Sequence, residues 1–164
     1  MLIEYATEAL APAIAALRND AADRLTAQYG RTYGSGHCSE RGVLSDMTRG
    51  GIVYVARVSE ALLGTMTLAT RKPWAIDAAC FSASRAPLYL TNMAVAPVHQ
   101  RTGVGRALLA AAGRIAAGWP ADAIRLDAYD AAFGAGPFYA KCGFREVGRK
   151  VYRGVPLIYY ELTV

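Results

Sequence analysis

The sequence has few cysteines and no long apolar run. Its three cysteines, Cys38, Cys80 and Cys142, stand far apart in a chain of 164 residues. Their odd number and wide spacing match neither a disulfide framework nor a zinc-binding pattern, so we expect no metal. Arg, Gly or Pro breaks every apolar stretch well short of the ~20 residues that a membrane span requires. We therefore expect no membrane partner.

Positive charge near the N-terminus and clustered cations are also missing. Glu4 and Glu8 stand where a secretory signal peptide would carry positive charge, so we expect no export signal and a reducing, cytoplasmic location. The formal net charge is +5, but no run of five or more Lys or Arg occurs, and only three of the 18 basic residues are lysine. Scattered arginines are compatible with an anionic ligand and do not indicate a nucleic-acid partner.

What the sequence does contain predicts one folded domain over residues 1–164. Apolar residues make up 54% of the chain and charged residues 19%, which is typical of a globular protein. Helical spacing predicts helices over 8–17 and 21–29, followed by a glycine-rich stretch over 30–51 with one turn of helix at most, around 45–48. A second irregular stretch covers 71–87.

The remaining segments predict strands and two further helices. The strands are expected over 52–58, 62–70, 88–95, 123–129, 144–152 and 155–164, and the helices over 103–117 and 136–142. The strand–helix–strand unit over 88–129 should supply one parallel pairing. The order predicts an α+β fold with a mostly antiparallel sheet of about six to seven strands flanked by helices.

The segment QRTGVG, residues 100–105, joins a predicted strand to a predicted helix. It is not a P-loop, because Arg106 stands where the motif requires lysine, and as a dinucleotide fingerprint it lacks a small residue at Leu108. Amides at a helix N-terminus favour an anion, glycine permits close approach of the backbone, and Arg101 adds charge. These features suit a pyrophosphate, and a glycine-bearing connection without a ligand is the alternative.

Two motifs in order resemble the GNAT superfamily of acyl-CoA N-acyltransferases. A strand that ends in Val95-Ala96-Pro97 and continues into QRTGVG matches the first signature, and Tyr139 shortly before Gly143-Phe144 matches the second. The resemblance extends from about residue 52 to the end of the chain. It implies a GNAT-like fold in which the parallel strand pair splays apart. It also implies an acetyl-CoA-dependent N-acetyltransferase that acts on a small-molecule amine by direct transfer.

The resemblance also implies which residues contact acetyl-CoA, the co-substrate. Main-chain groups of the strand would hold the pantetheine arm, and amides at the helix start would hold the pyrophosphate. The implied cofactor-binding residues are Met93, Ala94, Val95, Gln100, Arg101, Thr102, Gly103, Val104, Gly105 and Arg106. Many relatives carry Asn where this chain has Ala132, so either the cofactor contacts of that Asn are lost here or the backbone at Gly134 and Gly136 replaces them.

The catalytic residues that the resemblance implies are Tyr139 and, less directly, Asn92. Tyr139 matches the usual general acid, which protonates the departing thiolate; a core aromatic residue is the alternative. The predicted strand over 88–95 contains no carboxylate. Asn92 could position a water or the acceptor, and an ordinary strand residue is the alternative. We expect water-mediated deprotonation of the amine. Asp127, Asp130 and Glu161 are possible proton acceptors, and none of them is assigned as the base.

A non-catalytic acyl-CoA-binding sensor or partner domain is the alternative function. The acceptor pocket should be walled by the N-terminal region and the two irregular stretches, which contain Tyr29, Tyr33, Trp74, Phe81, Arg31, Arg41, Arg71 and Arg85. These arginines motivate the hypothesis that a small amine with a carboxylate is preferred over a polycation, although solvated surface arginines explain them equally well. The apolar C-terminal strand could form a homodimer edge or part of the core.

Overall fold

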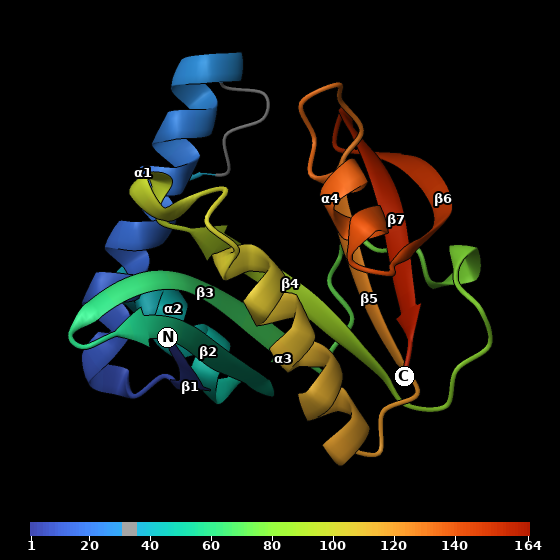
Figure 1. Cartoon of the computed structure of the whole chain (residues 1–164). Coiled ribbons are helices and arrows are strands. Elements are labelled where there is room, and N and C mark those ends of the chain that lie inside the picture. The colour runs from blue at the N-terminus through green and yellow to red at the C-terminus, as the bar shows by residue number, and fades with distance from the viewer. Residues whose placement is uncertain (31–35) are drawn as a thin grey trace.

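The computed structural model describes residues 1–30 and 36–164, and in this part of the chain seven strands form one mixed sheet (Figure 1). The strands lie in the order β1-β2-β3-β4-β5-β7-β6. Their bounds are β1 Leu2–Tyr5, β2 Gly51–Val58, β3 Ala61–Ala69, β4 Pro87–Val95, β5 Ala123–Tyr129, β6 Arg145–Tyr152 and β7 Val155–Thr163. Only β4 and β5 pair in parallel among these strands. The predicted α+β fold is therefore confirmed.

The sequence did not predict strand β1. It pairs antiparallel with β2, with Leu2 opposite Arg57 and Tyr5 opposite Tyr54. A strand of four residues at the edge of a sheet is too short to show a clear alternation of apolar and polar side chains.

The C-terminal strand β7 lies inside the sheet, between β5 and β6. Its apolar run over residues 157–160 is buried in the core. The suggestion that this strand forms a dimer edge is therefore wrong, and core packing explains its apolar character.

Four α-helices and three short 3-10 helices complete the described chain. Their bounds are η1 Glu8–Leu10, α1 Ala11–Tyr29, α2 Glu40–Thr48, η2 Ala78–Cys80, η3 Pro97–His99, α3 Val104–Gly118 and α4 Gly136–Lys141. None of the helices in residues 1–30 and 36–164 is long and apolar enough to cross a bilayer.

Helix α1 is continuous where the sequence predicted two helices. The polar residue Asn19 lies between the two predicted helices, and it makes two hydrogen bonds to the backbone of Cys38. Its amide nitrogen donates to the Cys38 carbonyl at 3.0 Å, and its amide oxygen accepts from the Cys38 nitrogen at 2.7 Å. A tertiary contact thus explains a polar side chain in the middle of the helix.

Helix α2, Glu40–Thr48, lies in the glycine-rich stretch over 30–51, where the sequence predicted at most one turn of helix around 45–48. Ser39 caps its N-terminus, because the side-chain oxygen accepts from the Gly42 nitrogen at 3.1 Å, and Glu40 adds favourable charge to the first turn. The prediction failed because the surrounding glycines obscured this capping signal.

The helices cover the sheet on both faces (Figure 1). Helices α1 and α2 bury one face of the sheet through contacts that include Ile14, Val43 and Val53. Helix α3 packs on the opposite face, where Leu108 and Ile124 lie in the largest apolar cluster, and Tyr139 of α4 belongs to the same cluster. The segment over residues 71–86 packs on β4 and β7 in a separate apolar cluster, in which Ile76 packs with Tyr89, Leu157 and Tyr159.

Candidate active site

Strands β4 and β5 pair only near their beginnings. Residues 87–89 pair with residues 123–125, and within the described chain the pairing of the two strands ends there. Figure 1 shows the strands diverging toward their C-terminal ends. Backbone groups of residues 90–95 that face β5 therefore have no strand partner on that side. An extended ligand could hydrogen-bond to them as an added strand would.

A β-bulge lies in β4 beside this gap. Asn92 and Met93 together oppose the single residue Met66 of β3. Asn92 has a φ of 51°, in the left-handed region that asparagine tolerates better than most residues. A bulge bends its strand and redirects its side chains, so it helps to turn β4 away from β5.

The N-terminus of α3 presents free amides at the end of this gap. Gly103 is the N-cap with a φ of 95°, a conformation that favours glycine. The Ala107 nitrogen donates to the Gly103 carbonyl at 3.0 Å, and the amides that precede it have no partner within the helix. A Cβ atom on Gly105 would lie 3.1 Å from the ring of Phe138, so glycine lets α3 approach α4 closely. The helix start is suited to an anion.

A groove of about 780 Å³ runs from this helix start toward α4. It is lined by Met93, Ala94, Val95, Gln100, Arg101, Gly103, Gly105, Arg106, Phe133, Ala135, Phe138 and Tyr139. The structure thus brings eight of the ten predicted cofactor-binding residues to one groove, and Thr102 and Val104 are not among its walls.

Local contacts limit what several of these side chains can do. The Gln100 side chain donates to the Val95 carbonyl at 3.2 Å, and the Thr102 hydroxyl donates to the His99 carbonyl at 2.6 Å. The Val104 side chain is buried in the core. At Thr102 and Val104 the backbone amide is therefore the group that remains for a ligand.

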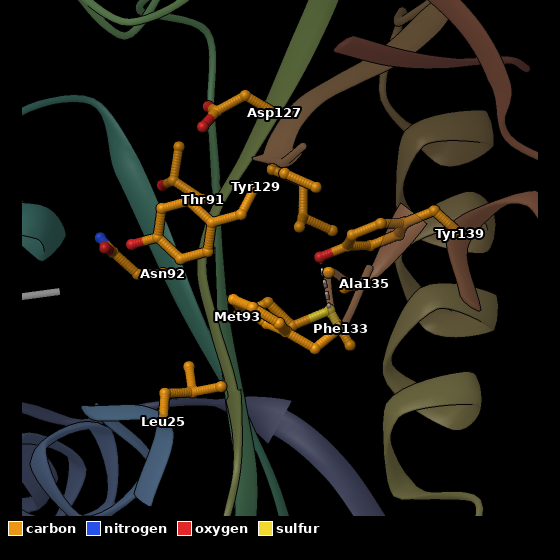
Figure 2. Close-up of a pocket in the computed structure, with 12 residues that line it drawn as sticks. Leu25, Thr91, Asn92, Met93, Asp127, Tyr129, Phe133, Ala135 and Tyr139 are labelled. Atoms are coloured by element: carbon orange, nitrogen blue, oxygen red, sulfur yellow. Dashed lines mark hydrogen bonds between the residues drawn. The ribbon is translucent and has the colours of Figure 1, made fainter. Parts of the chain in front are cut away.

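A second cavity of about 500 Å³ lies between the diverging strands, and Figure 2 shows its walls. It shares Met93, Phe133, Ala135 and Tyr139 with the groove. Its other lining residues are Leu25, Leu90, Thr91, Asn92, Asp127, Ala128, Tyr129 and Gly134. Phe133 also stacks on Tyr29 at the end of α1, with ring centroids 3.7 Å apart, which links the two sides of the cavity. The cavity and the groove meet at Tyr139.

Tyr139 is 8% exposed, and its hydroxyl points into the cavity toward the Met93 sulfur, 4.0 Å away (Figure 2). Burial raises the pKa of the Tyr139 phenol well above its ordinary value, and the charge of Asp127 raises it further. The phenol therefore stays protonated across the neutral pH range and can donate a hydrogen bond into the cavity.

Asp127 is the acidic residue of this cavity. Burial raises the pKa of its carboxyl above the ordinary value. The register places Tyr89 opposite Arg125, two residues before Asp127, so Asp127 lies on the sheet face opposite α3. Tyr139 belongs to the cluster on the α3 face. The carboxylate and the phenol thus reach one cavity from opposite sides of the sheet.

The other two candidate proton acceptors have structural partners. Glu161 is buried and forms an ion pair with Arg125 at 2.9 Å. Asp130 forms an ion pair with Arg149 at 3.0 Å. Neither lines the cavity, so the structure distinguishes Asp127 from both. From the sequence, Asp127 was only one of three carboxylates that could accept a proton.

Asp46 of α2 holds the side chain of Asn92 through a hydrogen bond. Its amide nitrogen donates to the Asp46 carboxylate at 2.9 Å, and the same carboxylate oxygen accepts from Arg18 at 2.7 Å. Arg18 is buried and also donates to the Thr67 hydroxyl at 3.1 Å. The amide oxygen of Asn92 is thus the group left for a ligand on this side of the cavity.

The predicted acceptor walls are only partly brought together. Arg71 and Trp74 line a cleft beside the cavity. Phe81 packs on Tyr159 and under Arg125, away from the cavity, and Arg85 precedes the paired beginning of β4. Arg41 lies on α2 outside the cleft, and Arg31 and Tyr33 lie outside the described residues.

Residues 49–146 match the family model described as acetyltransferase (GNAT) domain. The match spans more than half of the chain and includes the β4–α3 joint, Asp127 and Tyr139. The chain belongs to the GNAT acetyltransferase family. It is therefore an N-acetyltransferase by family, and the family resemblance seen in the sequence is confirmed.

Solved structures resemble this acetyltransferase along almost its whole length. Ribosomal-protein-alanine N-acetyltransferase from Brucella melitensis has a TM-score of 0.74 at 21% identity, with 100% of each chain covered. The putative acetyltransferase yncA from Salmonella typhimurium, with its cofactor acetyl-CoA, has a TM-score of 0.71 at 18% identity and covers 99% of this chain and 92% of its own. An aminoglycoside 6'-N-acetyltransferase complexed with coenzyme A has a TM-score of 0.68 at 17% identity, with 99% and 97% covered. A comparison with curated proteins gives no match.

Proposed function

We propose that this acetyltransferase transfers the acetyl group of acetyl-CoA directly to the amine of a small molecule. The observation that carries the proposal is that Asp127 and Tyr139 line one cavity, which joins the groove at the amide-rich start of α3. A cavity of about 500 Å³ suits a small acceptor. The three free cysteines fit the reducing cytoplasm expected from the sequence.

The groove fits coenzyme A in charge and in shape. The amides of residues 101–106 and the side chains of Arg101 and Arg106 would hold the pyrophosphate. Main-chain groups of residues 93–95 in the gap would hold the pantetheine arm. When bound, acetyl-CoA supplies an activated acetyl group as a thioester. Two of the similar structures contain coenzyme A or acetyl-CoA, which supports this proposal.

Tyr139 serves as the general acid. When the amine nitrogen attacks the thioester carbonyl carbon and the carbon–sulfur bond breaks, the thiolate receives the phenol proton. The raised pKa of Tyr139 keeps that proton in place until negative charge develops on sulfur. Desolvation in the same cavity also raises the proton affinity of the thiolate. The difference between the pKa of the phenol and that of the thiol is therefore smaller.

Asp127 serves as the general base. An amine must lose a proton to attack and to form a neutral amide, and a raised carboxyl pKa makes Asp127 a better proton acceptor than an exposed carboxylate. A water relays the proton, as expected from the sequence, and Asp127 is its destination. Because Asp127 and Tyr139 approach from opposite faces of the sheet, the amine can lie beside the base while the thiol lies beside the acid.

Backbone amides and Asn92 complete the site. An N–H group of Met93 or Ala94 in the gap would stabilise the negative charge that develops on the thioester oxygen. The free amide oxygen of Asn92 would accept a hydrogen bond from the amine. The absence of a carboxylate from the strand over 88–95 supported a non-catalytic binding module. Asp127 on the neighbouring strand places a carboxylate in the cavity, which weighs against that alternative.

Thiol release from acetyl-CoA with a panel of small amines tests the proposal. Thermal protection by acetyl-CoA is measured in parallel, so cofactor binding and turnover are read separately. We expect protection together with amine-dependent release, and an acetylated amine detectable by mass spectrometry. Protection without release for any amine would support the binding-module alternative, and no protection would contradict the cofactor assignment.

A further inference from the structure

A second cleft opens beside the cavity on the face that carries Asp127. Its volume is about 420 Å³, and it lies between the end of α2, the end of β3 and the segment that follows β3. Thr91 and Asn92 line both this cleft and the cavity. A molecule whose amine reaches Asp127 could therefore extend over the bulge in β4 and place its other end in the cleft.

Three cations line this cleft. Arg49 and Arg71 are exposed, and in residues 1–30 and 36–164 no carboxylate pairs with either. The Lys72 ammonium donates to the carbonyls of Pro73 at 3.1 Å and Ile76 at 2.6 Å. These bonds to neutral groups hold the lysine in place. Its charge helps to lower the pKa of Asp77, but the ion pair of Asp77 is with Lys150, at 3.5 Å.

The acidic residue in the wall of the cleft does not cancel this charge. Asp46 forms an ion pair with Arg18 at 2.7 Å, and Arg18 is buried behind it. The pair is neutral overall, so the three cations dominate the field in the cleft. A cationic wall attracts an anionic group and repels a polyamine.

Trp74 stands at the rim of the cleft and is 82% exposed. Its ring offers an apolar surface beside the cations, which suits the carbon skeleton of a ligand whose end group is charged.

We propose that this cleft binds a carboxylate of the acceptor through Arg49 and Arg71. The preferred substrate is then a small primary amine that carries a carboxylate. This inference rests on the proposed function, because the cleft can select a substrate only if an amine is acetylated in the adjacent cavity. Arg71 was among the arginines considered from the sequence, whereas Arg49 and Lys72 come from the structure.

Matched acceptors test the inference. Each amino acid in a series of increasing chain length is compared with its own carboxamide, so that only the carboxylate differs. Charge-assisted hydrogen bonds to arginine predict that kcat/KM favours the carboxylate by about tenfold or more at the best chain length. The Arg49→Gln and Arg71→Gln double variant should remove this preference through KM. Arg41→Gln, on the same helix outside the cleft, should leave it unchanged.

A binding measurement separates this inference from the proposed function. The N-acetylated amino acid and its N-acetylated carboxamide are titrated against the wild-type protein and the double variant by thermal shift. We expect the carboxylate to protect the wild type against heat more strongly than the carboxamide does. Both ligands should protect the double variant equally weakly. Equal protection of the wild type by the two ligands, a preference that persists in the double variant, or a polyamine as the best acceptor would each overturn the inference. If acetyl-CoA neither binds nor reacts while the carboxylate still binds, only the proposed function fails.

Discussion

Replacing Asp127 with asparagine should separate the role of this residue in catalysis from any role in stability. The two side chains have the same shape, so the cavity should keep its form. A positioned general base contributes roughly 10²–10⁴-fold to rate. We therefore expect kcat in Asp127→Asn to fall by at least about 100-fold, with the affinity for acetyl-CoA unchanged, because Asp127 does not line the cofactor groove.

The same variant should gain stability near neutral pH. Burial raises the pKa of Asp127 in the folded protein, so the charged form destabilises the fold. A raised carboxyl pKa means that stability is highest below the unfolded pKa and falls as pH rises through the folded pKa. Each unit by which the pKa is raised corresponds to about 1.4 kcal/mol at neutral pH. Asparagine carries no charge, so the gain should be present at pH 7 and absent near pH 3.

The pH profile of kcat/KM supplies the third measurement. In the wild-type enzyme, activity should fall on the acid side as Asp127 takes up a proton, and Asp127→Asn should lose this acid limb. A limb caused by protonation of the acceptor amine itself would persist in the variant, so one acceptor is used throughout. Asp130→Asn is the matched control, since Asp130 pairs with Arg149 outside the cavity. Full activity in Asp127→Asn, or an equal loss in Asp130→Asn, would refute the assignment.

Three further changes test the rest of the site. Tyr139→Phe should lower kcat by about 10²-fold or more while acetyl-CoA protects against heat as well as before; normal turnover would show that another group protonates the thiolate. Glu161→Gln should weaken the buried pair with Arg125 and lower the free energy of unfolding in urea by about 3 kcal/mol, and an unchanged transition would contradict the contribution of this pair. Gly103→Ala places a Cβ at a φ of 95° and should reduce both stability, by about 1 kcal/mol, and acetyl-CoA affinity. Gly154→Ala, at a φ of 81° in the β6–β7 turn, should reduce stability alone, so equal loss of cofactor affinity in both variants would count against pyrophosphate binding by the amides at the start of α3.

The sequence was sufficient for the features that local chemistry determines. Strand β5 was predicted at its observed bounds, because Ala123–Tyr129 combines a strand pattern with a clear break at Pro120. The β4–α3 joint was predicted because glycine and proline mark it within a few residues. Helix α1 was divided in error, and the partner of Asn19, which lies between the two predicted helices, is Cys38, a residue far along the chain.

The proposed base and the proposed acceptor cleft could be located only in the tertiary structure. Asp127 is one carboxylate among three until the sheet register shows which face it occupies and Arg125 is seen to hold Glu161. Arg49 could not be placed because α2 was not predicted. The sequence shows which residues are charged, but the distances between these residues depend on which strands are neighbours in the sheet.

The bulge at Asn92 connects these parts of the molecule. A non-glycine residue in the left-handed region costs about 1 kcal/mol or more, so surrounding contacts must hold it there. The contact that does so is the hydrogen bond from Asn92 to Asp46, whose carboxylate is fixed by the buried Arg18. This pair therefore has two effects: it holds the bend that keeps β4 away from β5, and it neutralises the acidic group in the wall of the cationic cleft. The gap proposed to admit the cofactor and the charge proposed to select the acceptor thus depend on the same buried arginine.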